Sequence, residues 1–109
     1  MSTKYRHSID NTMNLFDYTI PDTGENFDTL LSHKNIEILR IISSEQLEKK
    51  EYCQEEDEWV VVLEGSALLL IEGKEKRVDK GEWLFIPAHT RHSVAKTEKG
   101  TLWLAVHIR

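Results

Sequence analysis

The chain has 109 residues, which is enough for one domain with one hydrophobic core and one pocket and too few for two domains. Hydrophobic residues make up 39% of the sequence and charged residues 30%, and no apolar run reaches the ~20 residues that a membrane span requires. The formal net charge is −5, and basic residues are interleaved with acidic ones, whereas nucleic-acid binding requires clustered Lys and Arg. We therefore expect a globular protein whose partners include neither nucleic acid nor a membrane.

The N-terminal segment is polar and shows no hydrophobic period. We expect residues 1–13 to form a flexible or partner-ordered N-terminal arm and residues 14–109 to form the single domain. No apolar stretch of the kind found in secretory signals follows Met1. Cys53 is the one cysteine, so no intramolecular disulfide can form, which is consistent with a reducing compartment. These observations predict a cytoplasmic protein.

A short helical turn is predicted near the start of the domain. Phe27, Leu30 and Leu31 occupy positions i, i+3 and i+4, which is the spacing of one face of a helix. The Pro21–Gly24 stretch before them has residues typical of a turn. We therefore expect the chain to turn and then to form one or two turns of helix.

The segment that follows the first predicted strand has a conflicting pattern. Residues 43–51 contain good helix formers, and Ser43 with Gln46 three positions later resembles a capping box. Leu47, however, is the single apolar residue of the segment and gives a helix no apolar face to bury. We favour an irregular loop over a helix.

The remaining sequence predicts short β-strands. Runs rich in β-branched and aromatic residues are separated by glycine-containing turns, and apolar residues recur at every second position in several of them. Short strands joined in this way are typical of an all-β sandwich or barrel. The clearest expected strands are residues 36–42, 58–65, 66–71, 81–87 and 102–106.

The first strand of the central hairpin, with the residues before it, resembles the first motif of the cupin superfamily. In that motif two histidines separated by one residue are followed by a glutamate and, seven positions later, by a glycine. Glu58 and Gly65 match this pattern, while Tyr52 and Gln54 take the two histidine positions. The sequence thus retains half of the motif and replaces two ligands that cupins use for metals.

The following strand and loop resemble the second cupin motif. Gly81, Pro87 and His92 match the glycine, proline and histidine of that motif, whereas His89 and Lys96 take the places of a second glycine and an asparagine. Other stretches also look like a subgroup of small single-domain bacterial cupins. The resemblance implies a cupin-type double-stranded β-helix, which is a jelly-roll barrel, and a homodimer formed through sheet edges.

The resemblance and the alternation of strand side chains define a candidate site. If Glu58 faces the barrel interior, Tyr52 and Gln54 share its face when no bulge intervenes. His92 from the second motif would converge on the same place in a cupin barrel. His107 is in phase with inward residues of the last strand and either lines this pocket or is a core histidine, and His89 is expected at the pocket rim.

Two interpretations of this constellation remain open. Gln54, Glu58 and His92 would bind one divalent metal ion, such as Zn, Ni, Fe or Mn. Tyr52 would be a weaker fourth ligand, because a phenol with a pKa of roughly 10 resists ionisation. Alternatively, Glu58 and His92 hydrogen-bond each other in a polar pocket without a metal.

Three functions are compatible with such a pocket, because cupins host many unrelated activities. The first is the binding of a small carboxylate-like or sugar-like molecule inside the barrel. The second is an enzyme, such as an isomerase or lyase, in which Glu58 or His92 acts as the general acid or base. A dioxygenase, in which these residues help to hold the metal, fits less well because both histidines of the first motif are missing. The third is a non-catalytic structural or regulatory module.

Overall fold

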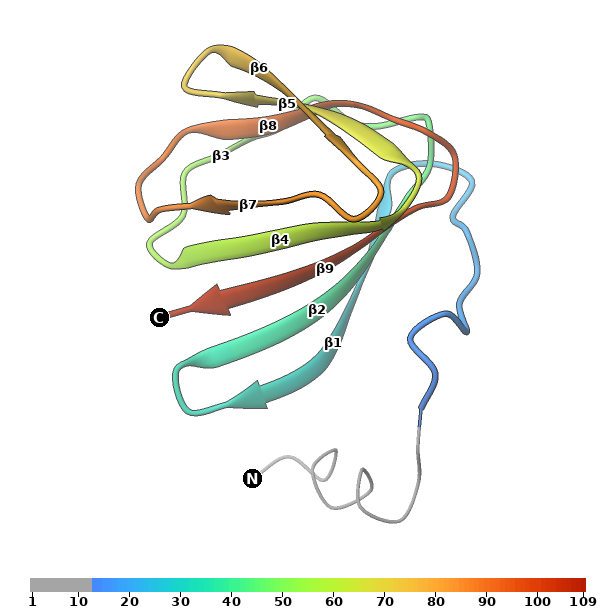
Figure 1. Ribbon diagram of the computed structural model, residues 1–109, viewed down its shortest axis with the longest axis horizontal. Helices are drawn as coiled ribbons and strands as arrows, with labels where there is room; N and C mark the ends of the chain where they lie inside the picture. Colours follow the sequence, from blue (N-terminus) through green and yellow to red (C-terminus); the bar gives the residue numbers. More distant parts are fainter. Residues whose placement is uncertain (1–12) are drawn as a thin grey trace.

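The structure is a computed structural model that describes residues 13–109 (Figure 1). The arm expected for residues 1–13 therefore lies outside the described residues, except for Met13. Within the described part of the chain all regular structure is β-strand, and no helix could cross a membrane. The strands are β1 (Glu25–His33), β2 (Ile36–Ser43), β3 (Glu51–Tyr52), β4 (Asp57–Glu64), β5 (Ser66–Ile71), β6 (Lys74–Asp79), β7 (Trp83–Ile86), β8 (His92–Thr97) and β9 (Thr101–Ile108).

The strands form two antiparallel sheets that lie face to face (Figure 1). The five-stranded sheet has the order β1-β2-β9-β4-β7, and the four-stranded sheet has the order β3-β8-β5-β6. Strands that are distant in sequence thus become neighbours, because β9 pairs with both β2 and β4. This architecture confirms the expected all-β jelly-roll barrel.

The hydrophobic core fills the space between the sheets. Alternate residues of each strand point inward, so that β4 supplies Val60 and Val62 and β9 supplies Trp103 and Ala105. The opposite sheet contributes Leu69 and its neighbours, all nearly inaccessible to solvent. The core occupies one part of the barrel and leaves the polar inward positions of the same strands for a pocket.

The predicted helical turn is wrong, because residues 25–33 form strand β1 and pair with β2. The register of this pairing shifts between Thr29 and Leu31, so Leu30 is an extra residue in a β-bulge. An extra residue breaks the alternation of faces and places Phe27, Leu30 and Leu31 at a spacing that resembles a helix. Pairing with a neighbouring strand overrides this local signal.

The expected irregular loop between β2 and β3 is confirmed. Ser44, rather than Ser43, organises it: its hydroxyl donates to the carbonyl of Gly24 at 2.9 Å and accepts from the backbone N–H of Gln46 at 3.1 Å. Such local bonds from a serine side chain compete with helix formation. The loop is therefore fastened to the chain just before β1, at one end of the barrel.

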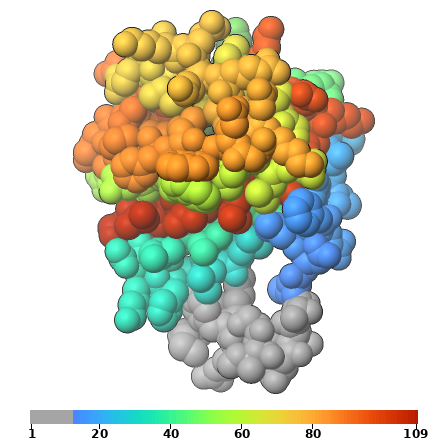
Figure 2. Space-filling model, viewed as in Figure 1, coloured from blue at the N-terminus to red at the C-terminus, as the bar shows by residue number. Residues whose placement is uncertain are grey.

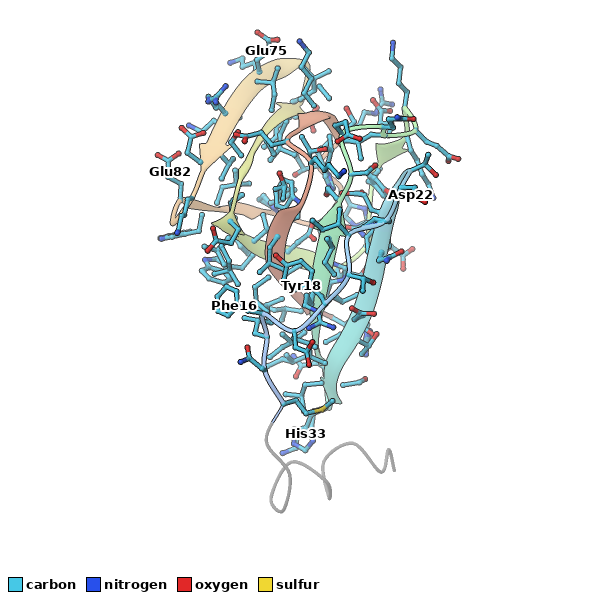
Figure 3. All side chains as sticks on the ribbon, turned by 90° about the vertical axis from the view of Figure 1, so that its right-hand side faces the viewer. Phe16, Tyr18, Asp22, His33, Glu75 and Glu82 are labelled. Atoms are coloured by element: carbon cyan, nitrogen blue, oxygen red, sulfur yellow. The ribbon has the colours of Figure 1, made fainter. Side chains whose placement is uncertain are left out.

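The outer face of the five-stranded sheet carries the segment that precedes β1, which includes Phe16 and Tyr18 (Figure 3). Arg40 on β2 donates hydrogen bonds to the carbonyls of Leu15 and Asp17 and forms an ion pair with Asp28 at 2.9 Å. Its guanidinium also lies 5.8 Å from the centre of the Tyr18 ring. One arginine thus fastens this segment to the barrel.

Two of the four edge strands, β6 and β7, differ in chemistry. Strand β6, with the sequence Lys-Glu-Lys-Arg-Val-Asp, is an edge of the four-stranded sheet and lies at the surface of the molecule (Figure 2). Its charged side chains oppose pairing with another strand. Strand β7 instead exposes Trp83 and Phe85 at the edge of the other sheet. The homodimer expected from the sequence stays a prediction.

The motif glycine Gly65 generates a stability prediction. Its φ is +85°, and a Cβ at this position would lie 2.6 Å from Oγ1 and 3.0 Å from Cα of the fully buried Thr101. We expect Gly65→Ala to lower the free energy of unfolding by roughly 2–4 kcal/mol, through backbone strain and the steric clash together. Urea denaturation measures the loss. Gly73→Ala is the matched control, because Gly73 has φ +79° but no atom within 4 Å of its Cβ position, and equal losses in the two variants would contradict the prediction.

Candidate functional site

A cavity of about 80 Å³ lies between the two sheets, and the predicted site residues line it. This volume holds several waters or one small ligand. Most of the wall is apolar, with side chains such as Leu39, Val60 and Ile86. The sequence-predicted residues that the structure brings to this cavity are Tyr52, Gln54, Glu58, His92 and His107.

Strand pairing explains why these side chains meet. Glu58 on β4 is directly opposite His107 on β9, and Tyr52 on β3 is directly opposite His92 on β8. Residues opposite each other in an antiparallel pair project from the same face. The rings of Tyr52 and His92 are stacked, with centroids 5.7 Å apart. Two strand pairs, one from each sheet, therefore present their polar residues to one interior space.

Glu58 is the centre of the polar cluster, and its side chain is 12% exposed. Its Oε2 accepts a hydrogen bond from Nε2 of His107 at 2.9 Å. Its Oε1 lies 3.6 Å from Nε2 of His92, which is longer than a direct hydrogen bond. Burial opposes ionisation of this carboxyl, but the interactions with His107 and His92 outweigh burial and lower the pKa of Glu58 to about 2. Glu58 is therefore a carboxylate inside the barrel at neutral pH.

The surroundings of His92 favour its protonated form. Its Nδ1 donates to the carbonyl of Thr90 at 2.9 Å, and its Nε2 faces Glu58. Both ring nitrogens thus face acceptors, which only an imidazolium can match with two N–H groups. The interaction with Glu58 raises the pKa of His92, burial lowers it, and the Thr90 carbonyl adds to the rise, with a net increase.

His107 is surrounded by three carboxylates. Its Nε2 bonds to Glu58, while its Nδ1 lies 3.9 Å from Glu56 and 4.0 Å from Glu37. The hydrogen bond to Glu58 raises the pKa of His107 against the opposing effect of burial, and the charges of the three acids raise it further. Of the two possibilities left open by the sequence, the structure places His107 in the pocket wall.

Glu25 is a site residue that the sequence reasoning missed. It begins β1, lines the cavity, and accepts a hydrogen bond on Oε2 from the hydroxyl of Ser43. The indole N–H of Trp103 donates to the same hydroxyl at 2.9 Å, which orients it. Burial raises the pKa of Glu25, the bond from Ser43 partly offsets this, and the negative charge of Glu58 adds to the rise. Strand alternation around residue 25 is the signal for it, but the spacing of Phe27, Leu30 and Leu31 predicts a helical turn there instead.

Gln54 carries an unsatisfied polar atom. Its Oε1 is buried and has no hydrogen-bond partner among the described residues. Its backbone carbonyl is fixed, because the N–H of His89 donates to it at 2.7 Å. His89 is exposed, does not line the cavity, and has a φ of +63°, the left-handed conformation that the family's glycine supplies at this position. His89 thus positions Gln54 through its backbone.

Tyr52 is a neutral phenol in this structure. Burial raises its pKa, and the negative charges of Glu25, Glu58 and Glu48 raise it further. A phenol held further from ionisation is a poorer metal ligand and remains a hydrogen-bond donor. The side chain of Lys50 lies over the Tyr52 ring, 5.2 Å from its centre.

The cupin resemblance implies a divalent metal, but the side chains in this cavity are poor ligands for one. Tyr52 and Gln54 stand at the two histidine positions, and Glu58 is already bonded to His107. Across residues 13–109 no group of three His, Cys, Asp or Glu side chains has the geometry of a metal site. His92 alone keeps an arrangement common in metal sites, with Nδ1 held by a carbonyl. The side chains instead neutralise one another.

A wider hollow of about 520 Å³ adjoins the cavity on the side of the loop between β2 and β3. The two spaces share Glu25, Phe27, Tyr52 and Val94 as lining residues, so these four side chains form the neck between them. We call the outer space the vestibule. A molecule entering the barrel from the vestibule passes Glu25 before it reaches Glu58.

Comparison with known proteins gives a consistent picture. A family model described as Cupin domain matches residues 40–107. A solved structure of a candidate mannose-6-phosphate isomerase from Ralstonia eutropha JMP134 is 41% identical, with 90% of this chain and 97% of that chain covered and a TM-score of 0.82. No curated protein matches the sequence.

More distant structures show a likeness of fold alone. A conserved protein of unknown function from Streptococcus pyogenes is 21% identical, with 91% of this chain and 87% of that chain covered and a TM-score of 0.78. The cobalt(II) form of HppE in complex with its substrate is 18% identical, with 78% and 52% covered and a TM-score of 0.68.

The pKa shifts predict a stability optimum in mildly acidic solution. The lowered pKa of Glu58 stabilises the fold above pH 4.5, and this contribution is lost as the pH falls from 4.5 toward 2. The raised pKa values of His92 and His107 stabilise it below pH 6.5, and that contribution is lost as the pH rises through their folded values. Urea denaturation across this pH range measures both limbs.

Glu58→Gln should lower the free energy of unfolding at the optimum by about 1–3 kcal/mol and flatten both limbs, because the amide cannot hold two imidazolium groups. Glu64→Gln, which removes a partly exposed ion pair with Lys80, is the matched control and should change stability by under about 1 kcal/mol. A Glu58→Gln variant with the wild-type pH profile would show that Glu58 is not the centre of the cluster.

Proposed function

The chain belongs to the cupin family, and on that premise we propose that it binds a small polar organic molecule inside the barrel. Glu58 and His92 are the polar anchors, and Gln54 and Tyr52 orient the molecule. The buried Oε1 of Gln54, which has no partner in the described structure, is the observation that carries this proposal.

A buried acceptor without a hydrogen bond destabilises a fold by about 1–3 kcal/mol, so such atoms are rare in native interiors. In this cavity the atom lies in a mostly apolar wall beside a charged cluster, which is the usual composition of small-molecule pockets. A ligand that donates a hydrogen bond to Gln54 satisfies it. This feature favours a binding pocket over an inert structural or regulatory module.

We propose that binding does not depend on a metal. Many cupins hold a metal ion at the motif positions, and the HppE structure contains cobalt. In this chain Glu58 and His107 satisfy each other, and the neutral Tyr52 and Gln54 supply no charge to neutralise a divalent ion. Redox chemistry on iron, as in a dioxygenase, is therefore the least supported alternative.

An acid–base enzyme is the second candidate function. One cavity holds Glu58 with a pKa of about 2, Glu25 with a raised pKa, and two imidazoles with raised pKa values. Environments that drive the pKa values of nearby groups apart are typical of sites for proton transfer. An isomerase or lyase would use this arrangement, and the Ralstonia eutropha relative carries the name of an isomerase.

The proposal is tested by ligand screening of untagged protein purified without chelators, with metal analysis of the same sample. We expect substoichiometric metal and at least one small hydroxylated or carboxylated molecule that raises the melting temperature and shifts the His92 ring resonances. His92→Ala and Glu58→Ala should abolish these effects, because they remove the anchors. His33→Ala, at the end of β1 and outside the cavity lining, should retain them.

Two outcomes would contradict the proposal. Near-stoichiometric metal that is lost in His92→Ala would show that Gln54 or Tyr52 completes a metal site. Ligand binding that survives both His92→Ala and Glu58→Ala would place the binding site elsewhere.

A further inference from the structure

The cavity presents donors and acceptors that a ligand must match. Gln54 offers a buried acceptor without a partner. His92 offers a donor, because its Nε2 is 3.6 Å from Glu58 and therefore lacks a direct hydrogen bond, while its Nδ1 is bonded to Thr90. The ligand accordingly needs one hydrogen-bond donor and one acceptor close together.

Glu25 supplies a further polar group at the neck of the cavity. Ser43 donates to its Oε2, and Trp103 donates to Ser43, so the carboxyl has a fixed position. It lines both the cavity and the vestibule, so it contacts a molecule that passes between them. Burial and the charge of Glu58 raise its pKa against the opposing bond from Ser43, so its carboxylic acid form, which donates a hydrogen bond, is more favoured than in a free carboxyl group.

We propose, resting on the proposed function, that the ligand is a small 2-hydroxycarboxylate and that Glu25 is a further residue that binds it. The ligand carboxylate accepts hydrogen bonds from His92 and from the acid form of Glu25. The ligand hydroxyl donates to Oε1 of Gln54. A cavity of about 80 Å³ suits a molecule of this size.

The charges around the site favour a single negative charge on the ligand. His107 bonds to Glu58 and lies near Glu56 and Glu37, whereas Nε2 of His92 has no direct hydrogen bond, so His92 is the imidazole left to match a ligand anion. The vestibule supplies no net positive charge for a second negative charge on the ligand, because its one cation among the lining residues, Lys50, stands with the carboxylate of Glu48. A phosphate ester, with two negative charges, is therefore a poorer match than a monocarboxylate.

The experiment uses three probes on the full chain: glycolate, acetate and ethane-1,2-diol. Acetate lacks the hydroxyl, and the diol lacks the carboxylate. NMR titration of the His92 ring measures each affinity, and we expect a millimolar Kd for glycolate, a ligand of five non-hydrogen atoms. Glycolate should bind at least about tenfold more tightly than either other probe, because acetate loses the hydrogen bond to Gln54 and the diol loses the charged acceptor for His92 and Glu25.

Variants of Glu25 test its role as a donor. Glu25→Ala should weaken glycolate binding about tenfold, because the donor is lost. Glu25→Gln should bind within about threefold of the wild type, since an amide N–H can donate from the same place. Glu98→Gln is the matched control: Ser66 donates to Glu98 at 2.5 Å in a similar Ser–Glu contact, and neither residue lines the cavity. This variant should bind glycolate as the wild type does.

Three outcomes would overturn the inference. Equal binding of the three probes would show that the hydroxycarboxylate pattern is not recognised. Much tighter glycolate binding by Glu25→Gln would show that Glu25 is an ionised, repulsive group. If other molecules from the screen shift the His92 ring resonances and glycolate does not, the pocket binds ligands but the proposed ligand class is wrong. If no molecule shifts these resonances, the proposed function fails as well.

Discussion

The site depends on one buried carboxylate, Glu58, and on the imidazole of His107 that bonds to it. An ion in a barrel interior is strongly destabilising unless it is paired and hydrogen-bonded. The pairing of β4 with β9 places His107 directly opposite Glu58, and β8 brings His92 from the other sheet. Both sheets therefore contribute to the stabilisation of one charge, and the polar end of the barrel is organised around it.

This arrangement gives a physical account of how the chain departs from the metal-binding pattern of cupins. A metal ion would neutralise Glu58 and orient the histidine of the second motif. Here His107, from the last strand, supplies the positive charge, and Tyr52 stacks on His92 at a position where a histidine would ligate. The pocket remains polar and ordered through hydrogen bonds and ring packing among its own side chains.

The sequence predicted the fold and most of the residues that line the candidate site, because motif residues and strand alternation are local signals. The predicted alternation grouped Tyr52 and Gln54 with Glu58, and all three line the cavity, although β3 and β4 belong to different sheets and Gln54 lies in the loop between them. Gly65 marks a turn that a side chain would block. The direct hydrogen-bond partner of Glu58 is His107 and not His92, because the pairing of β4 with β9 places His107 opposite Glu58. That pairing joins residues 49 positions apart, and no local pattern encodes it.

Glu25 was missed for a different reason. The bulge at Leu30 gives β1 an apolar spacing that resembles a helical turn, so the sequence does not show which residues of β1 point into the barrel. Its role also depends on Ser43 and Trp103, which lie on two other strands and meet it only in the folded barrel. Functional groups that are defined by such long-range contacts appear only when the strands are assembled.

The most direct measurement of the central claim is an NMR titration of the side chains themselves, with ¹³C detection of the Glu58 carboxyl and ¹⁵N detection of the two imidazoles. We expect Glu58 to remain ionised until the pH approaches about 2, and His92 and His107 to titrate above the ordinary histidine value of 6.5. A Glu58 that titrates near 4.5, beside imidazoles that are neutral at pH 6.5, would contradict the account.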